Sequence, residues 1–256
     1  LAIPLVAAMA LGPMLAWKRA DLAGALQRLW WVGALAVASA FLTLLVAGYH
    51  VWPALGFAAA AWLIFGAAAD ILDRIAAFRR PSQAWNRARG LPRAAWGGAI
   101  AHAGVGVMFA GLAGMGLATD ALVALKPGES TRLAGYEWRL ERIRDVQGPN
   151  WSARRATVTV LDGARVVTVL EPEKRFFPVG RMNTTEAAIH TNALRDLYAV
   201  LGDERDGGGV LRLHHNPLAP WIWFGAVIMA LGGGLSLSDR RVRVSAPSRK
   251  AATAPA

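Results

Sequence analysis

One histidine lies inside an apolar run that is long enough to cross a membrane. His102 is the only ionisable side chain in the 23 residues 96–118. On a helix, Gly98 lies about one turn before it and Gly106 about one turn after it, so the face around the imidazole is nearly bare. Because an ionisable group at membrane depth is costly, such a residue indicates a functional site.

Two interpretations fit this spacing. A neutral imidazole that faces a bare apolar slot suits axial ligation of haem iron, with Gly98 and Gly106 as the helix surface that the flat ring approaches. The run also contains seven glycines, which is typical of a seam where helices pack closely and a histidine hydrogen-bonds to a neighbouring helix. The spacing alone does not decide between them. A haem with two histidine ligands needs its second ligand from elsewhere, because no other apolar run of this sequence contains a histidine.

The other residue types exclude several chemistries. There is no cysteine, which rules out Cys-ligated zinc, iron–sulfur clusters and a thiol nucleophile within this sequence. No phosphate loop, HExxH motif or Ser/His/Asp constellation is present. Four further histidines fall at predicted loops or membrane surfaces, and the sequence assigns them no role: His50, His190, His214 and His215.

Composition and hydropathy predict the elements that hold His102. The 256 residues are 55% hydrophobic and 18% charged, which is too apolar for a soluble protein of this size. A membrane helix needs about 20 mostly apolar residues. Five runs are therefore predicted to span a membrane: 1–17, whose start we expect to be missing, 30–49, 51–69, 96–118 and 218–237.

The distribution of charge predicts how these spans are oriented. The formal net charge is +11, and 14 of the 28 Lys and Arg residues stand in segments 17–29, 70–95 and 238–256, which hold four acidic residues. Because basic residues concentrate in cytoplasmic loops, these segments are predicted to be cytoplasmic, with the tail 238–256 disordered. The basicity is then a topology signal, and we expect no nucleic-acid partner.

The segment 119–217 has a different pattern. Apolar and polar residues alternate in 136–140 and 156–160, and Asp162–Gly163 follows as a hairpin turn. Further strands are predicted near 174–179, 194–201 and 210–214, with a loop tip at 203–209. The predicted fold is an α-helical membrane protein of about five transmembrane helices, with a small all-β periplasmic domain inserted between the fourth and fifth helices.

Several stretches together resemble the CcmF family of bacterial cytochrome c maturation, in its C-terminal part only. They follow one another along nearly the whole sequence, and the histidine-containing helix and the last segment are the most specific. The stretches are 11–13 (LGP) with 17–18 (WK), 101–106 (AHAGVG), 174–179 (KRFFPV) with 185–189 (TEAAI) and 196–198 (DLY), and 217–225 (ending WIWFG) with 229–233 (MALGG) and 238–241 (SDRR).

The resemblance implies both an activity and a site. Members of this family of haem lyases join haem to the CXXCH thiols of apocytochrome c at the outer face of the bacterial inner membrane. They also hold a haem b within the membrane between two histidines, and His102 matches one of these axial ligands. The implied partners are a haem chaperone, apocytochrome c, the thiol-reducing and apocytochrome-binding subunits, and the lipid bilayer.

The resemblance assigns no catalytic residue to this sequence. The family's external haem motif and its histidines are expected upstream of residue 1, as is the second ligand of haem b. Carbon–sulfur bond formation is therefore implied for the full-length protein, and not for this segment alone.

Two other functions remain open. The protein could be a non-enzymatic membrane assembly or scaffold protein, whose periplasmic domain binds partners and whose His102 only packs. It could also be a haem lyase dedicated to the cytochrome c nitrite reductase, because nothing in these residues separates that branch from the others.

Overall fold

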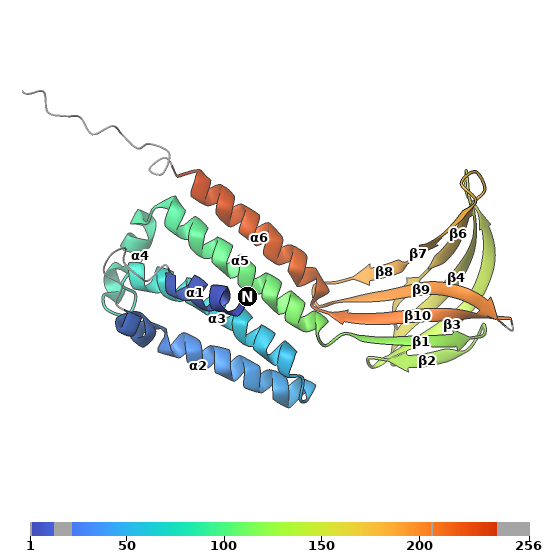
Figure 1. Cartoon of the computed structure of the whole chain (residues 1–256), viewed down its shortest axis with the longest axis horizontal. Coiled ribbons are helices and arrows are strands. Elements are labelled where there is room, and N and C mark those ends of the chain that lie inside the picture. Colours follow the sequence, from blue (N-terminus) through green and yellow to red (C-terminus); the bar gives the residue numbers. More distant parts are fainter. Residues whose placement is uncertain (1, 13–21, 206, 240–256) are drawn as a thin grey trace, which may run out of the picture. The chain divides into compact units, whose positions relative to one another are not determined.

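The computed structural model describes residues 2–12, 22–205 and 207–239. The chain divides into two compact units, one formed by Leu1–Phe41, Phe57–Met108 and Phe224–Ala256, the other by Leu42–Gly56 and Phe109–Trp223. Within the described residues there are six helices: α1 (Ala2–Leu11), α2 (Leu22–Ala47), α3 (Val51–Arg74), α4 (Pro81–Gly90), α5 (Arg93–Met115) and α6 (Ala219–Leu237) (Figure 1).

Four helices in the described part of the chain are long and apolar enough to cross a membrane: Ala23–Ala47, Val51–Arg74, Arg93–Met115 and Ala219–Leu237. They overlap the predicted spans 30–49, 51–69, 96–118 and 218–237, with ends that differ by up to several residues. Helix α1 has only 10 residues, about 15 Å of helix, which is half the thickness of a bilayer core. Residues 1 and 13–17 of the predicted span 1–17 lie outside the described residues, as does the predicted disordered tail beyond residue 239.

Glycines let the helices of the first unit pack backbone against backbone. A Cβ added to Gly104 of α5 would lie 2.7 Å from the Met229 nitrogen of α6, and one added to Gly232 of α6 would lie 2.5 Å from the Ala101 nitrogen of α5. Neither position has room for a side chain. The small-residue packing seam that the glycines of 96–118 indicate is therefore present, and it joins α5 to α6.

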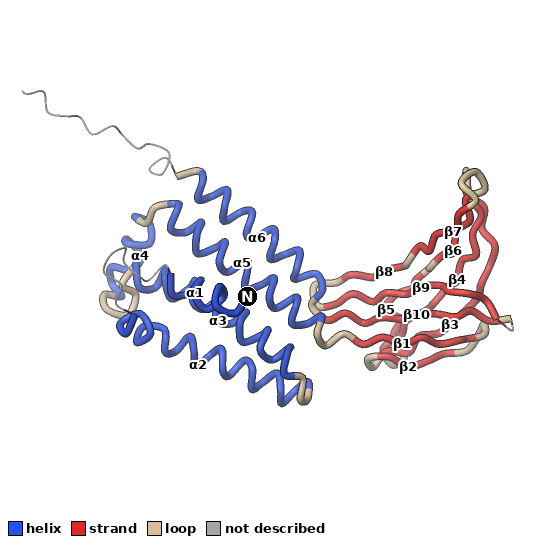
Figure 2. The backbone as a smooth tube through the Cα atoms, in the orientation of Figure 1, coloured by secondary structure: helices blue, strands red, loops and turns tan. Residues whose placement is uncertain are grey.

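All the described strands fall between α5 and α6 in the chain (red in Figure 2). One sheet has the order β1-β10-β9-β8, the other the order β2-β3-β4-β6-β7 with β5 also paired to β4. Every pairing is antiparallel. The strands are β1 (Thr119–Leu125), β2 (Ser130–Leu133), β3 (Tyr136–Gln147), β4 (Ser152–Asp162), β5 (Arg165–Leu170), β6 (Glu173–Phe177), β7 (Met182–Glu186), β8 (Ala188–Thr191), β9 (Arg195–Arg205) and β10 (Gly208–Pro217).

The local predictions for this region hold at the hairpin and fail at one loop. Asp162 pairs with Arg165 across a turn in which Gly163 has a φ of +57°, so the predicted β4–β5 hairpin is confirmed. The predicted loop tip 203–209 is wrong in extent, because Glu204 pairs with Gly209 and extends the β9–β10 ladder. The polar and glycine-rich composition of these strand ends concealed the pairing.

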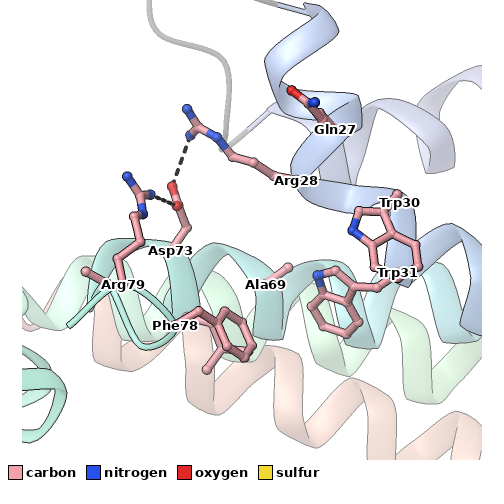
Figure 3. Close-up of a pocket in the computed structure, with 10 residues that line it drawn as sticks. Gln27, Arg28, Trp30, Trp31, Ala69, Asp73, Phe78 and Arg79 are labelled. Atoms are coloured by element: carbon pink, nitrogen blue, oxygen red, sulfur yellow. Dashed lines mark hydrogen bonds and ion pairs between the residues drawn. The ribbon is translucent and has the colours of Figure 1, made fainter. Parts of the chain in front are cut away.

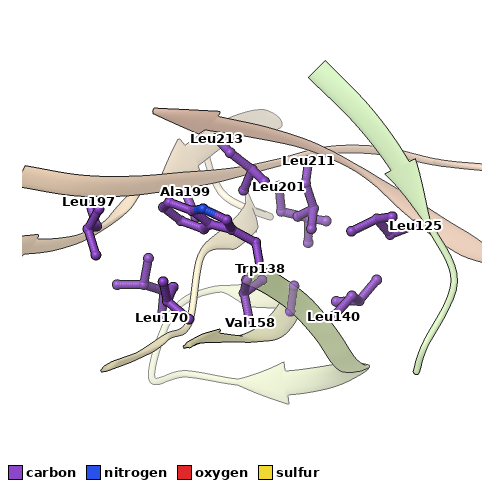
Figure 4. Close-up of a cluster of buried hydrophobic side chains, with 12 residues drawn as sticks. Leu125, Trp138, Leu140, Val158, Leu170, Leu197, Ala199, Leu201, Leu211 and Leu213 are labelled. Atoms are coloured by element: carbon purple, nitrogen blue, oxygen red, sulfur yellow. The ribbon is translucent and has the colours of Figure 1, made fainter. Parts of the chain in front are cut away.

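The two sheets share one hydrophobic core, which makes the domain a sandwich (Figure 4). Trp138 of β3 is fully buried among leucines of both sheets, and its Nε1 donates a hydrogen bond to the carbonyl oxygen of Leu133 at 3.3 Å. Strand alternation explains the pattern, because Trp138 and Leu140 point inward from β3, as Leu211 and Leu213 do from β10.

One carboxylate is buried where β4 and β6 pair. Glu173 is 4% exposed and accepts hydrogen bonds from Arg155 and from Nε of Arg175, the latter at 2.6 Å. Burial alone would raise the pKa of Glu173, but the hydrogen bonds from the two arginines outweigh it and hold the pKa below its ordinary value. The ionised form is therefore the one that the folded domain stabilises.

Replacing Glu173 with Gln is expected to destabilise the β domain at neutral pH by about 2 kcal/mol, because the two arginines lose an ionised acceptor and Gln keeps only one neutral acceptor oxygen. Since the folded pKa is lowered, this contribution is complete above the unfolded pKa of about 4.5 and disappears as pH falls through the folded pKa. Thermal unfolding of the two proteins between pH 3 and 8, followed by circular dichroism, measures the difference. The control is Glu186→Gln, since the side chain of Glu186 is 46% exposed and its Oε1 lies 3.8 Å from Nη1 of Arg175. An equal loss in both variants, or a loss independent of pH, contradicts the prediction.

Candidate functional site

The imidazole of His102 is held by its own helix. Its Nδ1 lies 2.7 Å from the carbonyl oxygen of Gly98, one turn earlier in α5. A carbonyl oxygen only accepts hydrogen bonds, so Nδ1 carries the hydrogen. In the neutral ring, Nε2 then keeps its lone pair and can bind a metal, with Gly98 fixing the orientation of the ring.

A cavity of about 100 Å³ opens beside this histidine. Most of its lining is small or apolar: Met9, Leu63, Gly66, Ala67, Ala94, Ala95, Gly98 and Ala99. No described heavy atom comes within 4 Å of a Cβ placed on Gly98, so this glycine leaves open space next to His102. Gly106 is different, because a Cβ there would lie 2.6 Å from Ile64 and 3.0 Å from the Ala60 carbonyl of α3.

The two glycines that the sequence groups with His102 therefore have different surroundings. Gly98 faces space that a ligand can enter, whereas helix packing against α3 accounts for the glycine at 106. The haem-facing role of both residues stays a prediction. The packing interpretation expects His102 to hydrogen-bond to a neighbouring helix. The structure instead pairs it with a carbonyl of its own helix.

Two charged side chains share this cavity, although nothing in the sequence connects them with His102. Asp70 is 8% exposed, and both its carboxylate oxygens lie 2.9 Å from Nε of Arg74. This contact uses one edge of the guanidinium. Within the described residues Asp70 is the acidic partner of Arg74, and the terminal nitrogens of Arg74 remain as donors. Proximity across two helices is a tertiary property, and the only local signal was the i, i+4 spacing of the pair.

The chemistry of these donors fits one side of a haem site. One imidazole nitrogen is anchored and the other is available, the surroundings are apolar, and a guanidinium stands at the same cavity. A porphyrin is far larger than the cavity of about 100 Å³, so the described residues would form only one wall of such a site.

The remaining histidines lie in the second unit. His214 packs edge-to-face with Tyr198 at 5.1 Å between ring centroids, and the ring centroid of His215 lies 6.0 Å from that of Tyr136. Burial, together with the charge of Arg195, lowers the pKa of His215. His50 lies between α2 and α3, and His190 on β8 pairs with Leu197. The structure brings none of these four into the cavity of His102.

Helices of membrane-crossing length combined with a β sandwich define the class: a multi-pass membrane protein that carries a folded β domain. Residues 116–217 match the family model described as the CcmF C-terminal beta-sandwich. The chain belongs to the CcmF family of cytochrome c-type biogenesis proteins. The resemblance read from the sequence is thereby confirmed.

Two curated relatives and one solved structure illustrate the relationship. The chain is 44% identical over 252 residues to the cytochrome c-type biogenesis protein ccl1 of Rhodobacter capsulatus, covering 96% of this chain. It is 42% identical over 257 residues to CycK of Rhizobium meliloti, covering 97%. It spans 37% of the length of each. The structure titled "Cytochrome c Heme Lyase CcmF" has a similar fold, with a TM-score of 0.68 and 22% identity, over 91% of this chain and 38% of that one.

Proposed function

We propose that the chain is the part of a cytochrome c haem lyase that supplies one axial ligand to a haem b within the membrane. The observation that carries the proposal is the geometry of His102. Its Nδ1 is anchored to the Gly98 carbonyl, and its Nε2 is available in an apolar cavity beside an open glycine. Metal-bound histidines have this arrangement, in which the second ring nitrogen donates to a carbonyl.

Four of the cavity residues have a role in this proposal. When bound, haem b supplies one-electron chemistry. His102 would hold the iron through Nε2, because the carbonyl of Gly98 fixes the orientation of its ring. Arg74 would offer its terminal nitrogens to a propionate carboxylate, since Asp70 already holds the guanidinium by Nε.

The attachment of haem to apocytochrome c takes place on the side of the β domain. The basic charge of segments 17–29, 70–95 and 238–256 supports a cytoplasmic location for these segments and a periplasmic location for residues 119–217. There the domain meets the haem chaperone, apocytochrome c and the thiol-reducing subunits. The names of the curated relatives, which refer to cytochrome c-type biogenesis, support a role in cytochrome c maturation.

A complementation assay tests the proposal. A strain without its own family member is given this chain together with the part of the ccl1 protein that the chain does not match. Haem bound covalently to a c-type cytochrome is then detected by peroxidase staining after denaturing electrophoresis. We expect stained cytochrome only when both parts are present. Unstained cytochrome, with both parts in the membrane and no Soret absorbance in the purified pair, contradicts the proposal and favours the scaffold function.

A further inference from the structure

A second, larger cavity lies between the start of α2 and the end of α3 (Figure 3). Its volume is about 750 Å³, within the range of sites that bind organic ligands. Aromatic rings of Trp30, Trp31 and Phe78 form much of its wall, and Trp30 and Phe78 are 71% and 80% exposed. Exposed aromatic surface of this extent marks a site for an apolar partner.

The charged side chains of this cavity, Arg28, Asp73 and Arg79, gather on one side (Figure 3). Asp73 accepts a hydrogen bond from Nη1 of Arg28 at 3.1 Å and pairs with Arg79 as well (Figure 3). One carboxylate shared by two guanidinium groups leaves one positive charge in excess. Both arginine side chains are more than half exposed, so their remaining N–H groups can reach a ligand. Guanidinium groups match the geometry of phosphate oxygens.

The charges and the aromatic rings lie at different depths. Arg28 immediately precedes the charge-free run of α2, and Asp73 lies in the last turn of α3. The arginines therefore stand at the level of the lipid headgroups and the indole rings at the edge of the hydrocarbon. Basic pockets between membrane helices bind anionic headgroups.

We propose that this cavity binds an anionic glycerophospholipid. The phosphodiester lies against Arg28 and Arg79, where its single negative charge balances the excess positive charge. An acyl chain follows the surface formed by Trp30, Trp31 and Phe78. The site is distinct from the cavity of His102, and its lipid does not depend on the haem proposal.

Lipid binding to the whole chain, delipidated in detergent, tests the proposal. Phosphatidylglycerol is titrated, and bound molecules are counted by native mass spectrometry. The double variant Arg28→Gln/Arg79→Gln is expected to bind roughly 25-fold more weakly, about fivefold for each arginine. The matched control is Arg87→Gln/Arg89→Gln, which removes the same charge from α4, outside the cavity. Phe78→Ser is expected to weaken binding with both arginines intact.

Several outcomes overturn the proposal. Equal losses in the two double variants indicate a diffuse basic surface. Equal affinity for phosphatidylcholine removes the requirement for an anionic head. Competition by glycerol phosphate at the same concentration as the lipid indicates a site for a soluble phosphate, and displacement by haemin at lower concentration indicates a porphyrin site.

Discussion

Replacing His102 with glycine is expected to remove at least nine-tenths of the b-type haem from the protein, produced together with the unmatched part of a full-length relative. In the proposed site the imidazole is the iron ligand, and its ring is fixed by the Gly98 carbonyl. The pyridine haemochrome assay measures haem content, and the Soret and α bands report the ligand set. A full low-spin spectrum in the variant shows that the ligand assignment is wrong, and so does a wild-type protein without haem.

Chemical rescue separates ligation from a role in packing. Glycine at 102 leaves a space next to that of Gly98, so added imidazole can enter and replace the lost ligand. The low-spin spectrum should return with imidazole and should not return with a similar concentration of pyrrole, which has no basic nitrogen. His190→Gly is the matched control, since His190 lies on β8, and it should keep its haem. A variant that loses haem through misfolding is not rescued and melts at a lower temperature than the wild type.

A second variant tests the open face directly. Gly98→Leu fills space in which no described atom lies within 4 Å of the Cβ, so it should fold normally and still exclude haem. Gly233→Leu on α6 is its control, because that glycine is equally open but does not line the cavity of His102. Retention of haem by Gly98→Leu contradicts the haem-facing role of this position.

The sequence identified His102 as a candidate site residue because the pattern that marks it is local. A single ionisable residue in a charge-free run is visible without any knowledge of the fold, and so is the Asp162–Gly163 turn. The surroundings of Gly106 were not visible, since its contact with Ile64 depends on how α3 crosses α5. The same limit applies to the lipid cavity, where Arg28 and Asp73 meet across 45 residues of chain.

The order of the strands shows this limit in the β domain. Alternation predicted several strands one by one, but it could not predict that β1 pairs with β10 or that β4 pairs with β6 across the β5 hairpin. Those pairings depend on which faces bury together, and Trp138 lies at the point where both sheets meet (Figure 4). The most informative substitution in this domain is therefore at a residue with no predicted role.

Replacing Trp138 with Ala is expected to destabilise the β domain by about 3–5 kcal/mol, which is a large part of the stability of a domain of this size. The indole is fully buried, so its removal leaves a cavity between the two sheets and loses the hydrogen bond from Nε1 to the carbonyl of Leu133. The melting temperature of the strand signal in circular dichroism should fall on the order of 20 °C. Trp138→Phe keeps much of the volume and should cost less than half as much.

Trp151→Ala provides the matched control, because Trp151 is only partly buried and its ring contacts the guanidinium of Arg175 at 4.3 Å. Its loss should cost about 1 kcal/mol.

The same pair of variants also tests the function of the domain. If residues 119–217 receive the apocytochrome, then Trp138→Ala should lower the yield of covalently haem-stained cytochrome and leave the haem b of the membrane helices in place, since the core of Trp138 and the cavity of His102 belong to different units. A simultaneous loss of haem b, or an unchanged cytochrome yield with the β domain unfolded, contradicts this division of roles.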